Sequence, residues 1–415
     1  MEISVEGGGG FDPRFVLVVV SSSFYFLGLG VLAPVLPRYV EHMLHGGGLA
    51  VGVAVGAFGL SAALLRSWVG RLGDRRGRRL LVVGGAAAVG LSIFGYGLDG
   101  LAVLVLMRLI SGAGEAAMFV GAATTAQDLA PEDRRGQAAS LFSIAVYGGI
   151  AVGPPIGEWI YRHHGIQPVW VLAGGLCLVG AALGMTLPDW VTPPGQSAQP
   201  DPPPEAPPAQ RRRFLHPAAV RPGIVLTLGG LGYAGFSSFI SLYADHIGLR
   251  GAGPVFVEYA AIVLAVRIVG SRLPDTLGPR RGPVLALALQ TAGLITIGVW
   301  AAPIGLYAAT AVYATGVSLL YPALFPAVVD AAPEAERGHA IATFTLFFDL
   351  SQGFGALILG AVVAVTSERG AFVAAGLGSA LGWWLHRRWV ATLPDAPGSA
   401  GPGPPVALPP AEPGE

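Results

Sequence analysis

The stretch GRLGDRRGRR, residues 70–79, interrupts a long apolar run that begins near Gly48. Six of its ten residues are charged, whereas only 12% of the whole chain is charged. Asp74 stands among five arginines, and the sequence becomes apolar again at Leu80. A compact charged segment between two apolar runs is typical of a short loop that joins two membrane-spanning helices.

The composition of the chain also points to a membrane protein. Of its 415 residues, 53% are apolar, and its mean hydropathy is +0.61. Soluble proteins usually carry about 25% charged residues, about twice the share found here. The net charge is zero, which gives no reason to expect nucleic acid as a partner. All the basic residues are arginine, so the lysine of an ATP-binding Walker motif is absent from the sequence.

Apolar runs long enough to cross a bilayer recur along the whole chain. About 20 residues of helix are needed to span the hydrocarbon core. The sequence therefore predicts an all-α membrane protein with twelve transmembrane helices, in two pseudo-symmetric six-helix bundles. The predicted spans are 15–39, 48–70, 80–98, 101–127, 138–161, 166–187, 222–246, 254–273, 282–301, 303–329, 339–365 and 371–393.

The arginines predict how the spans are oriented, because loops on the cytoplasmic side are rich in basic residues. With the N-terminus inside, eighteen arginines fall in cytoplasmic loops and span ends. Only four fall outside: Arg38, Arg162, Arg250 and Arg369. We therefore expect a multi-pass protein of the inner cell membrane with both termini in the cytoplasm.

A proline-rich segment divides the chain into two related parts. Residues 188–221 are expected to form a cytoplasmic linker between a first half (1–187) and a second half (222–393), and residues 394–415 a disordered tail. Asp74 and Gly77 recur 201 residues later as Asp275 and Gly278. The stretch DLAPEDRRGQA (128–138) is repeated 202 residues later as DAAPEAERGHA (330–340). These two matches predict a duplicated six-span unit.

Three motifs resemble those of the major facilitator superfamily of secondary transporters. The family's loop motif between spans two and three, G-x-L-x-D-R-x-G-R-R, is matched in full. The arginine and small residues of its span-four motif are matched by Arg108, Gly112, Gly114 and Ala116. Its span-five motif is matched except that Glu158 replaces the last glycine. The residues of the first and third motifs are Gly70, Leu72, Asp74, Arg75, Gly77, Arg78 and Arg79, and Gly149, Gly153, Pro154 and Gly157.

The resemblance implies that the charged loop is a gate. In the family this loop holds the two halves together on the cytoplasmic side. Asp74 is then expected to meet the start of span eleven near residues 338–343, and Asp275 the start of span five near residues 136–140. The simpler alternative is that these charges only anchor the topology. The other expected gate residues are Gly278, Arg280, Asp128 and Asp330.

The glycines of the span-five motif recur every four residues and form one flat stripe that allows close helix packing. In the family this motif is associated with exporters that exchange substrate against cations. The resemblance therefore favours efflux.

Charged residues inside the spans are the candidates for proton coupling, because a charge at mid-helix costs roughly 2.5–3.5 kcal/mol on insertion scales. Arg108 and Glu115 are seven residues apart and share a helix face, and Asp349 lies near the middle of its span. We expect Arg108 to be the partner of Glu115, which makes Glu115 the first choice for the coupling acid and Asp349 the second. The alternative is a static set of ion pairs that fixes packing. Arg66, Glu158 and Glu258 lie nearer span ends and could reach the interface.

Aromatic residues on spans that line the central cavity of the family are candidates for substrate contact, although each could equally be ordinary packing. They are Tyr25, Tyr233, Phe236, Phe239, Tyr313 and Tyr321.

His163 and His164 are adjacent but have no further ligands at metal spacing, and Cys177 is the one cysteine. No metal and no cofactor are expected.

Together these observations predict a monomeric secondary transporter, not an enzyme, that exports a small organic molecule or drug in exchange for protons. The main alternative keeps the fold but reverses the direction: proton-coupled or facilitated uptake of a sugar or similar metabolite. A membrane-embedded receptor or enzyme is the remaining alternative, and the absence of recognisable catalytic motifs in the sequence argues against it.

Overall fold

The computed structural model of the chain describes residues 11–131, 134–187, 215–270, 273–333 and 336–390. Over these residues the backbone is helical with short connections, and no strand occurs within them. The predicted tail (394–415) and residues 188–214 of the predicted linker lie outside the described part.

The first half contains six long helices. A short helix α2 (Val35–Arg38) and a π-helical turn η1 (Tyr39–Met43) extend the first of them, and a 3₁₀ turn η2 (Gly95–Gly97) follows the third. The chain enters the first helix through a cap, because the Asp12 side chain accepts a hydrogen bond from the amide of Arg14. The six helices are α1 (Pro13–Leu32), α3 (Gly48–Arg76), α4 (Arg78–Phe94), α5 (Leu101–Asp128), α6 (Arg135–His164) and α7 (Gln167–Gly184).

The second half repeats this pattern. Its helices are α8 (Pro217–His246), α9 (Gly253–Val269), α10 (Leu273–Val299), α11 (Pro303–Asp330), α12 (Arg337–Val365) and α13 (Glu368–Val390). α8 begins at Pro217, so the last five residues of the predicted linker (217–221) are helical. His216 caps that helix and Pro217 occupies its first turn, which explains the earlier start.

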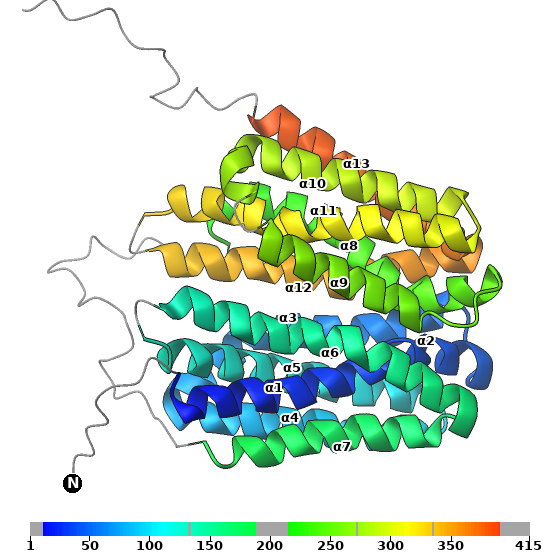
Figure 1. Cartoon of the computed structure of the whole chain (residues 1–415), viewed down its shortest axis with the longest axis horizontal. Helices are drawn as coiled ribbons and strands as arrows, with labels where there is room; N and C mark the ends of the chain where they lie inside the picture. The colour runs from blue at the N-terminus through cyan, green and yellow to red at the C-terminus, as the bar shows by residue number, and fades with distance from the viewer. Residues whose placement is uncertain (1–10, 132–133, 188–214, 271–272, 334–335, 391–415) are drawn as a thin grey trace, which may run out of the picture.

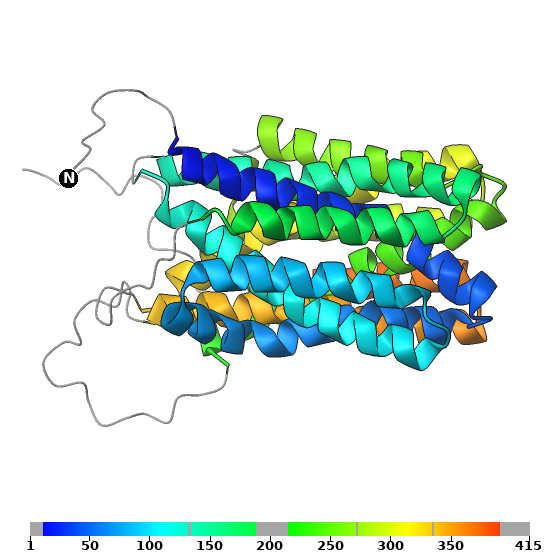
Figure 2. The same ribbon diagram turned by 90° about the horizontal axis from the view of Figure 1, so that it is seen from below.

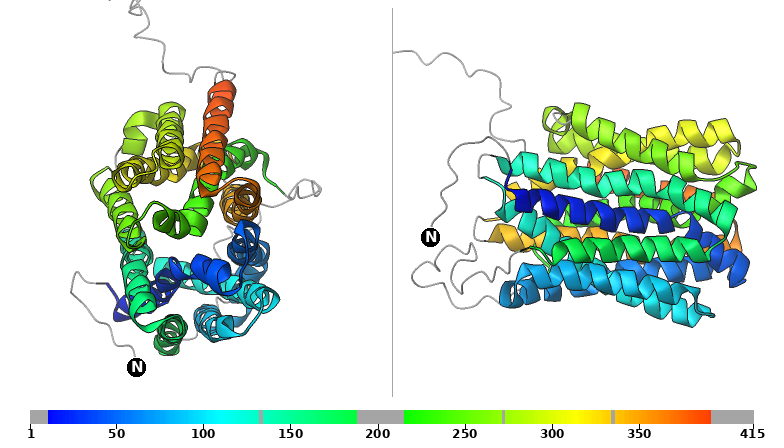
Figure 3. Two further views of the ribbon diagram at one scale, coloured as in Figure 1. Left: turned by 90° about the vertical axis from the view of Figure 1, so that its right-hand side faces the viewer. Right: turned by 60° about the horizontal axis from the view of Figure 1, so that its bottom comes forward.

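The predicted fold class is confirmed. In the described part, ten helical segments are long and apolar enough to cross a membrane, and α9 and α13 complete the two sets of six. Figure 1 shows the first half below and the second half above, with the axes of the long helices roughly aligned. Figure 2 gives the view from below, and the end-on view in Figure 3 shows the two groups of helices side by side.

The two halves meet mainly along two helix pairs, α3 with α12 and α6 with α9. Glycines bring α3 and α12 close together: a Cβ added at Gly59 would lie 2.8 Å from the backbone nitrogen of Gly353. Such glycine contacts allow two helix backbones to approach closely in a membrane. At this contact the backbones of the two halves therefore approach each other closely.

The two ends of the bundle differ in their arginine content, and we name them by it. The arginine-rich end carries the connections after α3, α5 and α11, and the first turn of α1 and the last turn of α13 also lie there (Figure 1). The arginine-poor end carries residues 33–47, 95–100, 165–166, 247–252, 300–302 and 366–367.

Candidate functional site

Three charged side chains meet near the middle of the bundle and form what we call the central ion cluster: Arg66, Glu115 and Asp349. Arg66 Nε lies 2.7 Å from an Asp349 carboxylate oxygen, and its Nη2 lies 3.6 Å from Glu115 Oε2. Asp349 is only 6% exposed. Arg66 and Glu115 belong to the first half and Asp349 to the second, so the cluster includes an ion pair between the halves.

The structure corrects the predicted partner of Glu115. Arg108 does not pair with Glu115; its Nε donates to the Ala54 carbonyl at 2.9 Å and its Nη1 lies 3.4 Å from the Tyr96 hydroxyl. Arg108 and Glu115 are seven residues apart, which places them about 10 Å apart along the axis of α5. The cation closer to Glu115 therefore comes from the neighbouring helix α3. Arg66, which was expected to reach the interface, is only 21% exposed at its side chain and takes that place.

A second group of charges joins the halves at the arginine-poor end. Arg38 donates to both carboxylate oxygens of Asp245, at 2.6 and 2.8 Å, and lies 3.1 Å from Glu158. Arg162 lies 3.1 Å from Glu158. We call Arg38, Glu158, Arg162 and Asp245 the arginine-poor ion cluster. Asp245 belongs to the second half and the other three to the first, so this cluster also bridges the halves.

Glu158 lies near a span end, where its side chain could have reached the interface, but the structure shows it buried, with 6% exposure. Its Oε2 accepts hydrogen bonds from the backbone amides of Ala252 and Gly253, at 2.8 and 2.9 Å. These amides form the N-terminus of α9, where a carboxylate is favoured by the helix dipole. The residue that departs from the family motif therefore links α6 to the other half.

Sequence reasoning did not single out Arg38 or Asp245. Each stands near the end of an apolar span, where a charge is ordinary, and nothing in the helical period shows that they face each other. The only available signal was the scarcity of arginine at this end of the bundle.

A cavity of about 220 Å³ lies between the halves. Arg108 and Tyr233 are the two predicted site residues among those that line it. It lies between the two ion clusters along the bundle, because Pro37 adjoins Arg38 and Gln352 lies one helical turn from Asp349. Its lining residues are Leu29, Leu32, Ala33, Leu36, Pro37, Val55, Phe58, Gly59, Arg108, Tyr233, Ser237 and Gln352.

The other predicted substrate contacts do not line this cavity. Tyr25, Phe236, Phe239 and Tyr313 are each 0% exposed and belong to the apolar core. Phe236 and Tyr313 have ring centroids 5.7 Å apart, and Tyr321 packs on Phe344 at 5.2 Å. These side chains face neighbouring helices of their own half, which a list of aromatic residues on a span does not reveal.

The predicted gate residues lie at the arginine-rich end. Gly77 has φ of 91° where α3 turns into α4, and Gly278 has φ of 65° at the matching kink in α10. These conformations favour glycine, in agreement with the duplicated motif. Arg78 forms an ion pair with Asp128, within the first half. Arg75, Arg280 and Asp330 are exposed, whereas Leu72 and Arg79 are half-buried.

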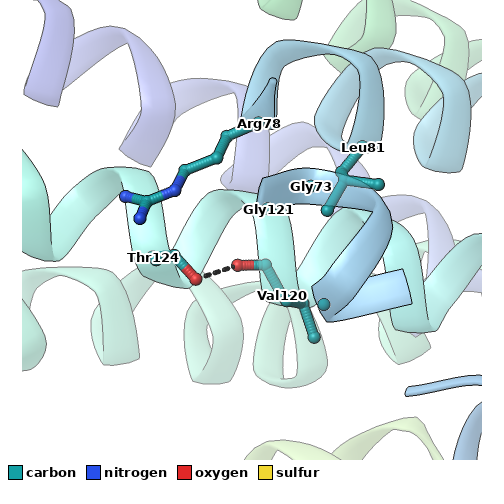
Figure 4. A pocket seen from close by; sticks show the side chains of 7 residues that line it. Gly73, Arg78, Leu81, Val120, Gly121 and Thr124 are labelled. Carbon is teal, nitrogen blue, oxygen red and sulfur yellow. Dashed lines mark hydrogen bonds between the residues drawn. The ribbon is translucent and has the colours of Figure 1, made fainter. Parts of the chain in front are cut away.

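The side chains of Asp74 and Asp275 lie outside the described part of the structure, so their predicted contacts across the halves stay predictions. Beside this loop, a hollow of about 120 Å³ is lined by Gly70, Gly73, Arg78, Leu81, Val120, Gly121 and Thr124. Figure 4 shows Arg78 and Thr124 on its wall, with the Thr124 hydroxyl donating to the Val120 carbonyl at 2.6 Å.

The glycine stripe of α6 lies against α1. A Cβ at Gly149 would overlap the α1 backbone at Phe26, and one at Gly153 or Gly157 would overlap it at Gly30 or Val31. Pro154 lies within this contact and inside the helix. The stripe therefore packs two helices of the first half and does not form the seam between the halves.

One group of side chains in the described part has ligand atoms close enough to hold a metal ion: Glu41, His246 and Glu368, within 4.8 Å of one another. Acidic groups at a surface often lie this close without an ion.

Comparisons with known proteins give a consistent picture. The model of the Major Facilitator Superfamily matches residues 18–307 and 255–412. An uncharacterized MFS-type transporter of Salmonella typhimurium is 28% identical over 368 residues, which cover 86% of this chain and 91% of that protein. The uncharacterized MFS-type transporter YhhS of Escherichia coli is 27% identical over 404 residues, 93% of this chain and 96% of that one.

Solved structures with the same fold include two transporters. The nucleoside transporter NupG has a TM-score of 0.74 and 13% identity, over 92% of this chain and 99% of that one. A bacterial homolog of the human lysosomal transporter Spinster, in an inward-facing and occupied conformation, has a TM-score of 0.72 and 15% identity. That match covers 92% of this chain and 98% of the homolog. At these identities the likeness shows the fold alone.

Proposed function

The chain belongs to the Major Facilitator Superfamily, and on that premise we propose that it exports a small organic molecule in exchange for protons. The family and the similar proteins are membrane transporters and not enzymes. The proposal adds a direction, a coupling ion and a mechanism of alternating access, with the protein acting as a monomer in the inner membrane and both termini in the cytoplasm.

The observation that carries the proposal is the placement of two ion clusters on either side of one cavity. Arg38 pairs with Asp245 beyond one end of the cavity, and Arg66 pairs with Asp349 beyond the other. Both pairs join the first half to the second. If they break in turn while the halves rock about the cavity, a substrate bound there is exposed first to one side of the membrane and then to the other.

The central ion cluster supplies a means of proton coupling. An ion pair in a membrane protein is favourable while both groups are charged, and a proton on Asp349 removes its attraction to Arg66. Moving the halves changes the access of that carboxylate to water, which links protonation to conformation. One proton moving down about 100 mV supplies about 2.3 kcal/mol, sufficient for about a fifty-fold substrate gradient.

The proposed direction is supported by the span-five motif, which in the family is associated with exporters that exchange substrate against cations. Uptake of a sugar or similar metabolite remains the alternative, since the same two clusters would serve either direction.

The test is a flux screen in everted membrane vesicles, with vesicles lacking the protein as the control. Export predicts that candidate compounds accumulate inside these vesicles when their lumen is made acidic, and that dissipating the pH gradient abolishes accumulation. Accumulation only in right-side-out vesicles would support uptake, and accumulation that is indifferent to the pH gradient would contradict proton coupling.

A further inference from the structure

Arg108 is a buried cation, and no carboxylate of the described residues lies beside it. The residue is only 7% exposed, and its partners are neutral: the Ala54 carbonyl, the Tyr96 hydroxyl and the face of the Phe58 ring, whose centroid lies 4.4 Å from the guanidinium carbon. A guanidinium stays charged in proteins. In the described part of the chain, Arg38 and Arg66 each contact two carboxylates, whereas Arg108 contacts none.

Arg108 has unused hydrogen-bonding capacity, and the residue lines the cavity. A guanidinium has five N–H donors, and in the described part of the chain acceptors lie within reach of Nε and Nη1 but not of Nη2. Arg108 is among the residues that line the cavity between the halves. A planar carboxylate can accept two parallel hydrogen bonds from such a group, which is the strongest form of this contact.

The rest of the lining limits what else can bind. No aspartate or glutamate is among the described lining residues, so the fixed charge at the wall is positive. Leu29, Leu32 and Val55 make much of the wall apolar, while Tyr233, Ser237 and Gln352 offer polar groups from the second half. The volume of about 220 Å³ lies below the roughly 300–1,000 Å³ of pockets for drug-sized ligands.

We propose that the cavity binds a small organic carboxylate, whose acid group pairs with Arg108 and whose apolar body contacts the leucines and Phe58. A hydroxyl or similar group at the far end of the ligand reaches Tyr233, Ser237 or Gln352. This inference rests on the proposed function, and it names the substrate class of that transporter. A ligand held in this way contacts both halves at once, with Arg108 from the first and the polar groups from the second.

The test measures binding to the purified full chain in lipid nanodiscs, by isothermal titration and by the shift in melting temperature. The probes are benzoate and 4-hydroxybenzoate, with benzamide and 4-hydroxybenzamide as neutral counterparts of the same shape. We expect the acids to bind about tenfold or more tightly than the amides, because the carboxylate is charged and can accept two parallel hydrogen bonds from Arg108, whereas the amide is neutral and has one acceptor oxygen.

Three variants locate the site. Arg108→Gln should abolish the preference for acids, and Arg108→Lys should keep part of it because the charge remains but the paired geometry is lost. Arg387→Gln is the matched control: it removes one exposed arginine at the end of α13 and should leave binding unchanged. If Arg108→Gln does not fold, Gln352→Ala is measured in its place. Gln352→Ala should reduce the ratio by which 4-hydroxybenzoate binds more tightly than benzoate.

Equal binding of acids and amides to the unaltered protein would overturn the inference, and so would an acid preference that survives in Arg108→Gln. Binding is measured without a pH gradient, so it tests the carboxylate site independently of the proposed proton-coupled export. Proton-driven flux of neutral compounds alone would contradict the carboxylate site but not the exporter. Acid binding without pH-dependent flux would contradict the exporter but not the site.

Discussion

Arg66 contacts carboxylates from both halves. The two distances indicate which carboxylate, when neutralised, weakens the contact between the halves. Its distance to Asp349 of α12 is 2.7 Å, and its distance to Glu115 of α5 is 3.6 Å. Asp349 is the member of the central ion cluster that comes from the second half. Neutralising it removes the attraction across the seam, whereas neutralising Glu115 removes a longer contact within the first half. We therefore propose that Asp349, rather than Glu115, carries the coupling proton.

Asp349→Asn should abolish accumulation driven by a pH gradient while substrate exchange without a gradient continues. Asparagine keeps the size of the side chain but can neither carry the charge nor take up the proton. Flux in proteoliposomes, with and without an imposed gradient, measures both activities. Asp99→Asn, at an exposed turn between η2 and α5, is the matched control and should behave as the unaltered protein does.

Glu115→Gln should reduce gradient-driven accumulation only partly, because the shorter ion pair of Arg66 remains. The same flux assay decides between the two acids. Loss of coupling in Glu115→Gln together with normal coupling in Asp349→Asn would move the proton to Glu115.

At the scale of single helices, the sequence predicted which residues share a helix face but not which neighbouring helix that face contacts. The spacing of Arg108 and Glu115 placed them on one side of α5, yet Arg108 reaches Ala54 and Glu115 reaches Arg66, both on α3. Helical periodicity is a property of one segment, and the identity of the neighbouring helix depends on the packing of all twelve. For the same reason the stripe of α6 was predicted, but its contact with α1 was not.

Gly157→Ala should destabilise the protein, because the added methyl group would overlap the α1 backbone at Val31. Overpacking of this kind typically costs about 1–3 kcal/mol. The measurement is the midpoint of thermal unfolding in detergent. Gly148→Ala in the same helix is the matched control, since a Cβ there meets nothing within 4 Å. An equal loss of stability in both variants would show that the close contact with α1 is not the cause.

For the whole molecule, although it placed the start of α10 nine residues late and the end of α3 six residues early, the sequence predicted twelve helices and the duplication of the halves. These features follow from apolar runs and from repeated motifs such as Asp74 and Asp275. The contacts between the halves could not be predicted, because Arg38, Asp245 and Asp349 come from distant spans and no local pattern links them. The cavity depends on the same contacts: of its lining residues only Tyr233 was predicted as a cavity residue, and Arg108 was predicted for proton coupling instead.

Tags at both the N-terminus and the C-terminus should be protected in intact cells, because the arginine-rich end of the bundle is expected to face the cytoplasm. Antibody labelling before and after permeabilisation measures this. Labelling of either tag in intact cells would contradict the orientation, although it would leave the fold unaffected.

The most direct test of alternating access is to measure distances between the halves at both ends of the bundle by double electron–electron resonance. Spin labels on introduced cysteines at His164 and Arg250 report on the arginine-poor end, and labels at Gln137 and Gly338 on the arginine-rich end; the native Cys177 is buried. Relative to the unaltered protein, Asp349→Asn should lengthen the arginine-rich distance, and Asp245→Asn should lengthen the arginine-poor distance while shortening the other. Distances at both ends that change together, or that respond to neither substitution, would contradict two halves rocking about a central cavity.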